Sequence, residues 1–270
     1  MEPRTPPQPL APVDYNRVQH QSYAQGRALP ADAMQRYMEV IGRHLPATRP
    51  LVGLDLGSGT GRFTPALAEA FGGPIYGVEP AAGLRHAALA GAAHPDVTYL
   101  AGRAEAIPLP DAAVDFALMF LSWHHVTDKP AAAREVARVL KPGGRLILRS
   151  TFQERIPDHW WRAYFPSSGD VERAMFQSEA EVRATFEGAR WRTVESVRME
   201  VPFEGDLASA VARLKLRAVS TFEHLTEAEL TEGFARIDAD LAVGAIVPKP
   251  TTGDFIVFTR AETPQEPAIA

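Results

Sequence analysis

The residues best suited to hold a ligand lie in a glycine-rich segment that follows a short apolar run. Gly57, Gly59 and Gly61 alternate directly after Leu51–Leu56, and a helical pattern begins at Phe63. Glycine permits positive φ and lets the backbone approach a ligand without a Cβ in the way. At the carboxyl end of the first strand of a doubly wound sheet, such a loop is a ligand site.

The spacing of these glycines excludes two common nucleotide-binding motifs. The dinucleotide fingerprint needs a glycine or alanine three residues after its second glycine, and Arg62 or Thr64 stands there in the two frames. A P-loop needs Gly-Lys-Ser/Thr, which does not follow. A purely structural turn remains the alternative for the loop by itself.

A carboxylate near the loop points to a more specific ligand. Glu79 ends the second expected strand, where it can accept hydrogen bonds from both hydroxyls of a ribose. Pro80 follows it and suits the start of a helix. A solvated acid is the alternative for Glu79 alone. Loop and acid together predict an adenosine-type ligand, without saying which one.

The glycine loop and Glu79 lie within an alternation of short apolar runs and helical patterns, which are the elements that would position them. Strand-like runs occur at 51–56, 74–78, 97–101, 114–120 and 145–148, with helical patterns at 63–71, 80–92 and 130–140 between them. This alternation is typical of crossover units on a parallel sheet, and continuous apolar runs indicate strands covered on both faces. We therefore predict an α/β fold with a doubly wound, mainly parallel sheet.

Composition and the positions of proline and glycine divide the chain into six expected segments. These are a flexible proline-rich tail (1–12), an amino-terminal helical arm or lid (13–46), a ligand-binding core (47–151), a cap or substrate insertion (152–190), the carboxy-terminal part of the sheet with its helices (191–260) and a flexible tail (261–270). The cap is predicted from the aromatic run His159–Phe165. Strand-like runs at 191–201 and 254–260 are expected to add an antiparallel edge.

The overall composition excludes several functional classes. The chain has no cysteine, which rules out disulfides, thiolate zinc sites and a cysteine nucleophile. Its net charge of −5 favours no nucleic-acid partner, and no stretch approaches the ~20 apolar residues of a membrane span. The first residues resemble neither a signal peptide nor an anchor. We expect a cytoplasmic protein, monomeric or homodimeric, that binds neither nucleic acid nor membrane.

Further motifs carry a resemblance to a known family. They are Gly102–Asp111, Val114–Met119, Ser122–Asp128 and Arg138–Gly144. In this order and spacing, over about residues 50–150, the sequence resembles the class I S-adenosylmethionine-dependent methyltransferases. It is most similar to the small-molecule branch that includes the ubiquinone/menaquinone C-methyltransferases.

The resemblance implies a Rossmann-like sheet with a small helical cap. It also implies the reaction that the protein would catalyse. The enzyme would methylate a small-molecule acceptor on O, N or C and release S-adenosylhomocysteine. One alternative is a protein that binds the cofactor for a non-methylating reaction such as cyclisation, or that senses it. A nicotinamide oxidoreductase is a second alternative, which the misplaced third glycine disfavours.

The resemblance also implies where S-adenosylmethionine would bind. The expected cofactor residues are Tyr15, Tyr23, Arg27, Asp55, Gly57, Ser58, Gly59, Gly61, Glu79, Pro80, Ala104, Glu105 and Leu121. Arg27, in an arm folded over the cofactor, would pair with the methionine carboxylate. Leu121 would face the sulfonium, and Glu79 would hold the ribose. Arg103 stands where this branch often has aspartate, which leaves the adenine contact to Glu105 or a backbone amide.

Two groups of residues are candidates for contact with the acceptor. His124 and His125 follow the fourth expected strand, and an imidazole could remove a proton if the acceptor must lose one. A structural or orienting role is the alternative. Candidate substrate residues, which would line an apolar pocket or simply pack the cap, are Trp123, His159, Trp160, Trp161 and Tyr164. We assign no metal ligands.

Overall fold

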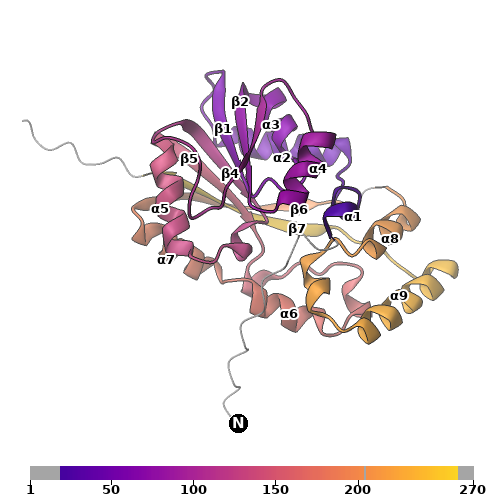
Figure 1. Cartoon of the computed structure of the whole chain (residues 1–270). Helices are drawn as coiled ribbons and strands as arrows, with labels where there is room; N and C mark the ends of the chain where they lie inside the picture. The colour runs from indigo at the N-terminus through magenta and orange to yellow at the C-terminus, as the bar shows by residue number, and fades with distance from the viewer. Residues whose placement is uncertain (1–18, 204, 261–270) are drawn as a thin grey trace, which may run out of the picture.

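The computed structural model describes residues 19–203 and 205–260, which form a seven-stranded sheet with helices on both faces (Figure 1). The strands are β1 (Leu51–Leu56), β2 (Gly72–Glu79), β3 (Val97–Ala101), β4 (Val114–Phe120), β5 (Leu140–Ser150), β6 (Trp191–Val201) and β7 (Thr251–Arg260). The helices are α1 (Gln19–Gly26), α2 (Ala31–Arg43), α3 (Thr64–Phe71), α4 (Ala82–Gly91), α5 (Lys129–Val139), α6 (Ser168–Met175), α7 (Glu179–Gly188), α8 (Leu207–Lys215) and α9 (Glu227–Ala242). Short 3-10 turns are η1 (Trp123–His125), η2 (Gln153–Arg155), η3 (Arg162–Tyr164) and η4 (Ser220–His224).

The strand order is β3-β2-β1-β4-β5-β7-β6. Strands β1 to β5 pair in parallel, whereas β7 runs antiparallel to both β5 and β6. This confirms the predicted doubly wound, mainly parallel sheet with an antiparallel edge. The order reverses between β1 and β4, so a crevice is expected outside the carboxyl ends of these two strands.

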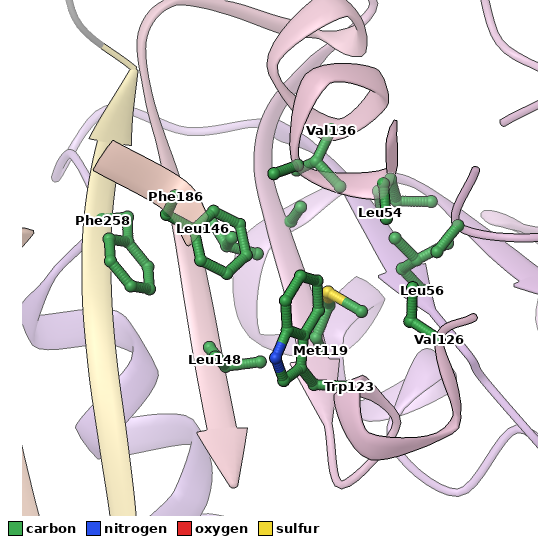
Figure 2. Packing of buried hydrophobic residues seen from close by; sticks show 14 of the residues in the cluster. Leu54, Leu56, Met119, Trp123, Val126, Val136, Leu146, Leu148, Phe186 and Phe258 are labelled. Atoms are coloured by element: carbon green, nitrogen blue, oxygen red, sulfur yellow. The ribbon is translucent and has the colours of Figure 1, made fainter. Parts of the chain in front are cut away.

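Strand β4 shows why the apolar runs form central strands. Phe116 and Leu118 are fully buried on one face, where they pack with α2 and α3. Ala117 and Met119 are fully buried on the other face, with α5 and α7. Figure 2 shows Met119 within this second cluster, beside Trp123. Because both faces are covered by helices, alternation of polar and apolar residues is lost from the sequence.

The predicted cap, residues 152–190, is corrected by the structure, because its last helix belongs to the core. Helix α7 places Val182 and Phe186 in the core cluster that Figure 2 shows in part. The ring of Phe186 stacks on that of Phe258 with centroids 4.4 Å apart, and it meets Trp191 edge to face at 5.8 Å. Helix α7 therefore covers the antiparallel edge of the sheet.

The cap instead combines two separate parts of the chain. The segment after β5 packs with α8, η4 and α9 around a third apolar cluster. Its buried members are Trp161, Tyr164, Phe165, Val211, Leu214, Phe222, Leu230, Ile237 and Ile246. Figure 1 shows α6, α8 and α9 grouped together beyond one end of the strands. Helix α1 contacts both α4 and α8, so the amino-terminal arm joins the core to the cap.

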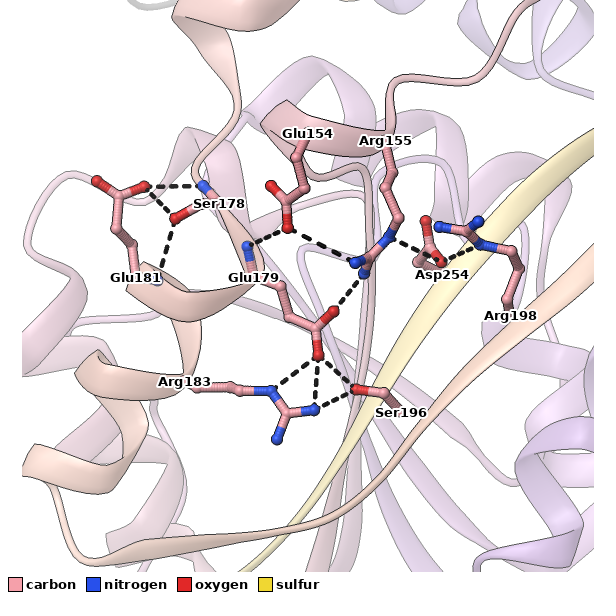
Figure 3. Close-up of polar contacts among 9 residues, drawn as sticks. All are labelled: Glu154, Arg155, Ser178, Glu179, Glu181, Arg183, Ser196, Arg198 and Asp254. Atoms are coloured by element: carbon pink, nitrogen blue, oxygen red, sulfur yellow. Dashed lines mark hydrogen bonds and ion pairs between the residues drawn. The ribbon is translucent and has the colours of Figure 1, made fainter.

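A polar network ties the start of the cap to α7 and to the sheet edge (Figure 3). Arg155 of η2 pairs with Glu179 at the start of α7 and with Asp254 of β7. Helix α7 begins with a capping box, in which Ser178 and Glu181 exchange hydrogen bonds between side chain and backbone. This network sets the point at which the chain leaves the sheet for the cap.

Candidate active site

The glycine loop after β1 is a tight turn held by the backbone of β2. Gly57, Gly59 and Gly61 all have positive φ, at 77°, 58° and 77°. The amide of Gly57 donates to the carbonyl of Val78 at 2.8 Å. A Cβ on Gly57 would lie 2.5 Å from the Cβ of Ser122, whereas one on Gly59 would meet nothing nearer than the Tyr23 ring at 3.8 Å. The backbone at Gly59 therefore faces the most open space of the three.

Two buried carboxylates flank this loop at the ends of neighbouring strands. Glu79 accepts hydrogen bonds from the amides of Gly59 at 2.9 Å and Ala81 at 2.8 Å. Burial raises its pKa, although these hydrogen bonds oppose the rise. Asp55 accepts from the Thr64 hydroxyl at 2.7 Å, and burial raises its pKa to about 6. Each oxygen keeps a lone pair that can accept from a ligand.

A small cavity lies beside the loop and contains several of the residues expected near adenosine. Its lining residues are Leu56, Gly57, Val78, Pro80, Arg103, Ala104, Glu105, Met119, Ser122, His125, Val126 and Thr127. The carboxylate of Glu105 accepts from the amides of Thr127 at 3.0 Å and Asp128 at 3.1 Å, so it also holds the loop before α5. Arg103 is largely exposed and lies 3.5 Å from Glu105.

The end of β4 separates this small cavity from a larger one. Leu121 has φ of 54°, a left-handed conformation that is uncommon for a leucine and marks local strain. Its amide donates to the carbonyl of Arg149 at 2.9 Å, and the next residue, Ser122, donates to the carbonyl of Leu56 at 2.8 Å. Leu121 lines the larger cavity and Ser122 the smaller one, while His125 lines both. The two cavities therefore adjoin at this turn.

The larger cavity, of about 240 Å³, is enclosed by the arm, the sheet and the cap. It brings together seven of the residues that the sequence singled out, namely Tyr23, Arg27, Leu121, His124, His125, His159 and Trp161. The arm contributes through α1, the sheet through the ends of β4 and β5, and the cap through the segment around η3 and η4.

His124 is the most unusual polar side chain of this cavity. Both of its ring nitrogens are buried and make no hydrogen bond. Its ring meets Phe176 of the cap edge to face at 4.8 Å. Burial, followed by the nearby His125 and cationic side chains, holds its pKa well below the ordinary value. A neutral imidazole with two unpaired nitrogens therefore borders the cavity, ready to donate or accept one hydrogen bond each.

The other two histidines lie in different surroundings. The His125 ring lies 3.9 Å from that of His124 and is exposed at the edge of both cavities. His159 stacks on the indole of Trp161, with ring centroids 5.3 Å apart and planes at 9°. Burial, helped by the charge of Arg162, lowers the pKa of His159 to about 3. His159 is thus a neutral, half-buried side chain of the cap wall.

Three of the candidate substrate residues do not line the larger cavity. Trp123 is a correction: its indole is 1% exposed in the core, tilted on Phe186 at 4.8 Å, with its N–H donating to Gln177 at 3.0 Å. Tyr164 is packed in the cap cluster, and its hydroxyl donates to Asp240 at 2.7 Å. Trp160 packs against the same cluster and borders a neighbouring cavity. Tyr15 lies outside the described residues.

Several polar residues of the larger cavity were not predicted from the sequence. Arg62, Arg149 and Glu172 all line it, as does Tyr37 of α2. Arg149 comes directly after the apolar residues of β5. A charged residue at the carboxyl end of a buried strand was the sequence signal that could have indicated a site residue here. The expected strand ended at Leu148 and left this arginine out. Across the part of the chain that the structure describes, no group of three or more His, Asp or Glu side chains could hold a metal ion.

Comparisons with known proteins agree with this architecture. Residues 54–148 match the model of a family described as methyltransferase domain. An uncharacterized methyltransferase of Mycobacterium tuberculosis is 44% identical over 119 residues, which make up 44% of this chain and 47% of that protein. The ubiquinone/menaquinone biosynthesis C-methyltransferase UbiE of Caulobacter vibrioides is 32% identical over 143 residues, 52% of this chain and 54% of that one. The chain thus spans about half the length of these curated relatives.

A solved structure extends the likeness over most of the chain. A protein from Anabaena variabilis, described as a methyltransferase from an antibiotic biosynthesis pathway, superposes with a TM-score of 0.71. The match covers 87% of this chain and 99% of that one, at 23% identity, so it shows the fold alone. Within the described residues, no helix has the length and apolar character to cross a membrane. Residues 54–148 are therefore similar to a methyltransferase domain, and the fold around them is that of the class I methyltransferases.

Proposed function

We propose that this protein transfers a methyl group from S-adenosylmethionine to a small-molecule acceptor. The observation that carries the proposal is the pair of cavities that adjoin at the turn after β4. The smaller one lies between the glycine loop and the positions expected to hold adenosine. The larger one is covered by the cap. A donor and an acceptor bound in adjoining cavities would meet beside Leu121.

The residues present fit the expected cofactor. The open space over Gly59 allows a ligand to lie against the backbone of the loop. Pro80 and Ala104 provide apolar walls of the smaller cavity, which suits an adenine ring. Arg27 borders the larger cavity near Tyr23, and its Nε atom is buried without a hydrogen-bond partner. A ligand carboxylate at this point would satisfy that donor through a charge-assisted hydrogen bond.

When bound, S-adenosylmethionine supplies an electrophilic methyl group on a positively charged sulfur. The protein's own contribution is positioning and exclusion of water. The cap wall formed by Trp161 and Phe176 would shield the acceptor from solvent. His124, neutral and unpaired, would orient the acceptor by a hydrogen bond, or take its proton where the acceptor must lose one. These roles follow from the position of the side chains at the cavity.

Methyl transfer can be tested without knowing the acceptor. The purified protein is incubated with S-adenosylmethionine carrying a tritiated methyl group and with the small-molecule fraction of a bacterial extract. We expect label in a small molecule and an equal amount of S-adenosylhomocysteine. Label found only in protein or nucleic acid, or a labelled product without S-adenosylhomocysteine, would contradict the proposal.

A matched pair of variants controls this assay. Gly59→Val places a side chain in the open space over the loop and should abolish transfer. Gly244→Val makes the same change at a glycine that also has positive φ, at 66°, with nothing within 4 Å of its Cβ position. The second variant should keep transfer once its folding is confirmed. Equal activity of the two variants would show that methyl transfer does not need the open space over Gly59.

A further inference from the structure

Three arginine side chains from distant parts of the chain surround the larger cavity. They are Arg27 after α1, Arg62 in the loop before α3, and Arg149 of β5. In the described parts of the chain, none of the three forms an ion pair with a carboxylate. Arg149 is only 8% exposed, and its Nε atom is buried without a hydrogen-bond partner. Within the described residues, no ion pair therefore neutralises this cationic wall of the cavity.

Two of the acids near this wall are already paired with other cations. Glu172 is the carboxylate that lines the cavity, and it pairs with Arg162 and accepts from Thr221 at 3.0 Å. Asp254 is close enough to affect Arg149 electrostatically. However, Figure 3 shows the carboxylate of Asp254 paired with both Arg198 and Arg155. The ion-pair distances are 2.9 Å to Arg198 and 3.6 Å to Arg155. Burying an unpaired cation is costly, so a ligand that supplies a negative charge is the natural partner.

The three arginines differ in what lies around them. Arg27 belongs to the arm that carries Tyr23 over the glycine loop, and its carbonyl accepts from Arg62 at 2.8 Å. These two lie on the side expected for the cofactor's methionine. Arg62 and Arg149 both lie over the ring of Phe120, 5.4 and 5.5 Å from its centroid, but Arg149 belongs to β5, beside Thr151, rather than to the glycine loop. It is therefore the cation best placed for the acceptor.

We propose that the acceptor is a small organic carboxylate whose anionic group binds Arg149. The planar guanidinium fork matches the two oxygens of a carboxylate. The aromatic residues Phe120, Trp161 and Phe176 line the same cavity and suit an apolar body on that acceptor. This inference rests on the proposed function, because it names the acceptor class of the same site.

The test uses near-isosteric pairs in which only the charge differs. The full-length protein is saturated with S-adenosylhomocysteine and titrated with acetate, benzoate, 4-hydroxybenzoate, succinate or decanoate, each beside its amide, by ligand-observed NMR. We expect the carboxylate of at least one pair to bind roughly ten- to hundredfold more tightly than its amide, since a hydrogen bond to a charged group has about this effect. Arg149→Gln should remove the preference, and Arg149→Lys should restore part of it.

Matched measurements separate this inference from the function on which it rests. Arg145→Gln removes a half-buried arginine from the same strand, outside the cavity, and should leave the preference intact. If the wild-type protein binds no S-adenosylhomocysteine, the proposed function fails and the inference fails with it. If it binds S-adenosylhomocysteine but no carboxylate more tightly than its amide, the inference alone is overturned. Loss of S-adenosylhomocysteine affinity in Arg149→Gln would also overturn it, by assigning Arg149 to the cofactor.

Discussion

At the scale of single residues, burial of the Asp55 carboxylate makes its contribution to stability depend on pH. Burial raises its pKa to about 6, from an ordinary value of 3.8. Between these two pH values the folded protein holds more protons than the unfolded chain. The contribution of Asp55 to the stability of the folded state therefore falls as pH rises from about 4 to 6 and stays lowered above that. At neutral pH the ionised carboxylate carries a penalty that a cationic ligand group would relieve.

We predict that Asp55→Asn stabilises the protein free of ligand at pH 7.5, by up to about 3 kcal/mol. The gain should shrink to near zero at pH 4, where the native carboxyl is also neutral. Urea unfolding across this range measures it, with Asp96→Asn as an exposed control. Calorimetry should show weaker S-adenosylhomocysteine binding by Asp55→Asn. A gain in stability that is the same at pH 4 and 7.5 would contradict this explanation.

His124 should give the opposite pH dependence. Its pKa in the folded protein lies well below the ordinary value, so below about pH 6.5 the unfolded chain takes up more protons than the folded protein. The contribution of His124 to the free energy of unfolding should therefore fall as pH drops from 7 to 5. His124→Phe removes both unpaired nitrogens while preserving a ring against Phe176, and it should flatten this fall. His86→Phe, at an exposed histidine, serves as the control in urea unfolding, and equal pH slopes for the two variants would contradict the account.

Sequence patterns predicted the arrangement of the glycine loop and its acids better than the lining of the larger cavity. Glycines after a strand and an acid at the end of the next one are local signals, because short loops place them together. Arg149 depends on partners from α2, β4 and the cap, which are distant in sequence. Trp123 was expected to contact the acceptor because it stands beside the histidines in the sequence. Its indole instead points into the core and packs on Phe186.

At the scale of elements, the glycine loop and the turn after β4 are packed against each other. A Cβ on Gly57 would meet the Cβ of Ser122 at 2.5 Å, and Ser122 is held by its hydrogen bond to Leu56. The strained Leu121 lies next to this contact. A change in the loop should therefore be transmitted to the point where the two cavities adjoin.

We predict that Gly57→Ala lowers the free energy of unfolding by about 2–4 kcal/mol, from positive φ and from the clash. Gly244→Ala shares the positive φ of 66° but has open space, so it should lose only about 1–2 kcal/mol. Urea unfolding measures both. Affinity for S-adenosylhomocysteine should fall only in Gly57→Ala. Equal losses of stability would show that the contact with Ser122 has no energetic role.

Most strands were predictable because their apolar runs are short and bounded by turn residues. The predicted strands 51–56, 97–101, 114–120 and 191–201 have the observed bounds. Helix α7 was assigned to the cap because its sequence does not reveal what covers it. Its burial comes from Trp191 and Phe258, which the chain supplies only later.

At the scale of the whole molecule, the core and the cap have separate apolar clusters. The cap cluster contains a close contact at Gly233 of α9, where a Cβ would lie 2.4 Å from the Phe165 ring and 2.7 Å from the Tyr164 carbonyl. The glycine loop and the two carboxylates beside it belong to the core. A substitution that weakens packing in the cap should therefore leave ligand affinity at the glycine loop unchanged.

We predict that Gly233→Ala destabilises the protein by about 1–3 kcal/mol, although alanine ordinarily favours a helix interior over glycine. Gly188→Ala at the end of α7, with nothing within 4 Å, should be neutral or stabilising. Thermal unfolding and S-adenosylhomocysteine titration check both variants. Affinity should be unchanged in each once the protein is folded. A fall in affinity that parallels the loss of stability would mean that the cap and the cofactor site are not separate.

The central claim is that the glycine loop, Asp55 and Glu79 bind an adenosyl sulfonium compound at the carboxyl edge of the sheet. Isothermal titration calorimetry of the purified full-length chain with S-adenosylhomocysteine tests it most directly. We predict saturable binding of one molecule per chain, with no measurable binding of NAD at the same concentration. Absence of binding to S-adenosylhomocysteine, or equal affinity for NAD, would contradict it.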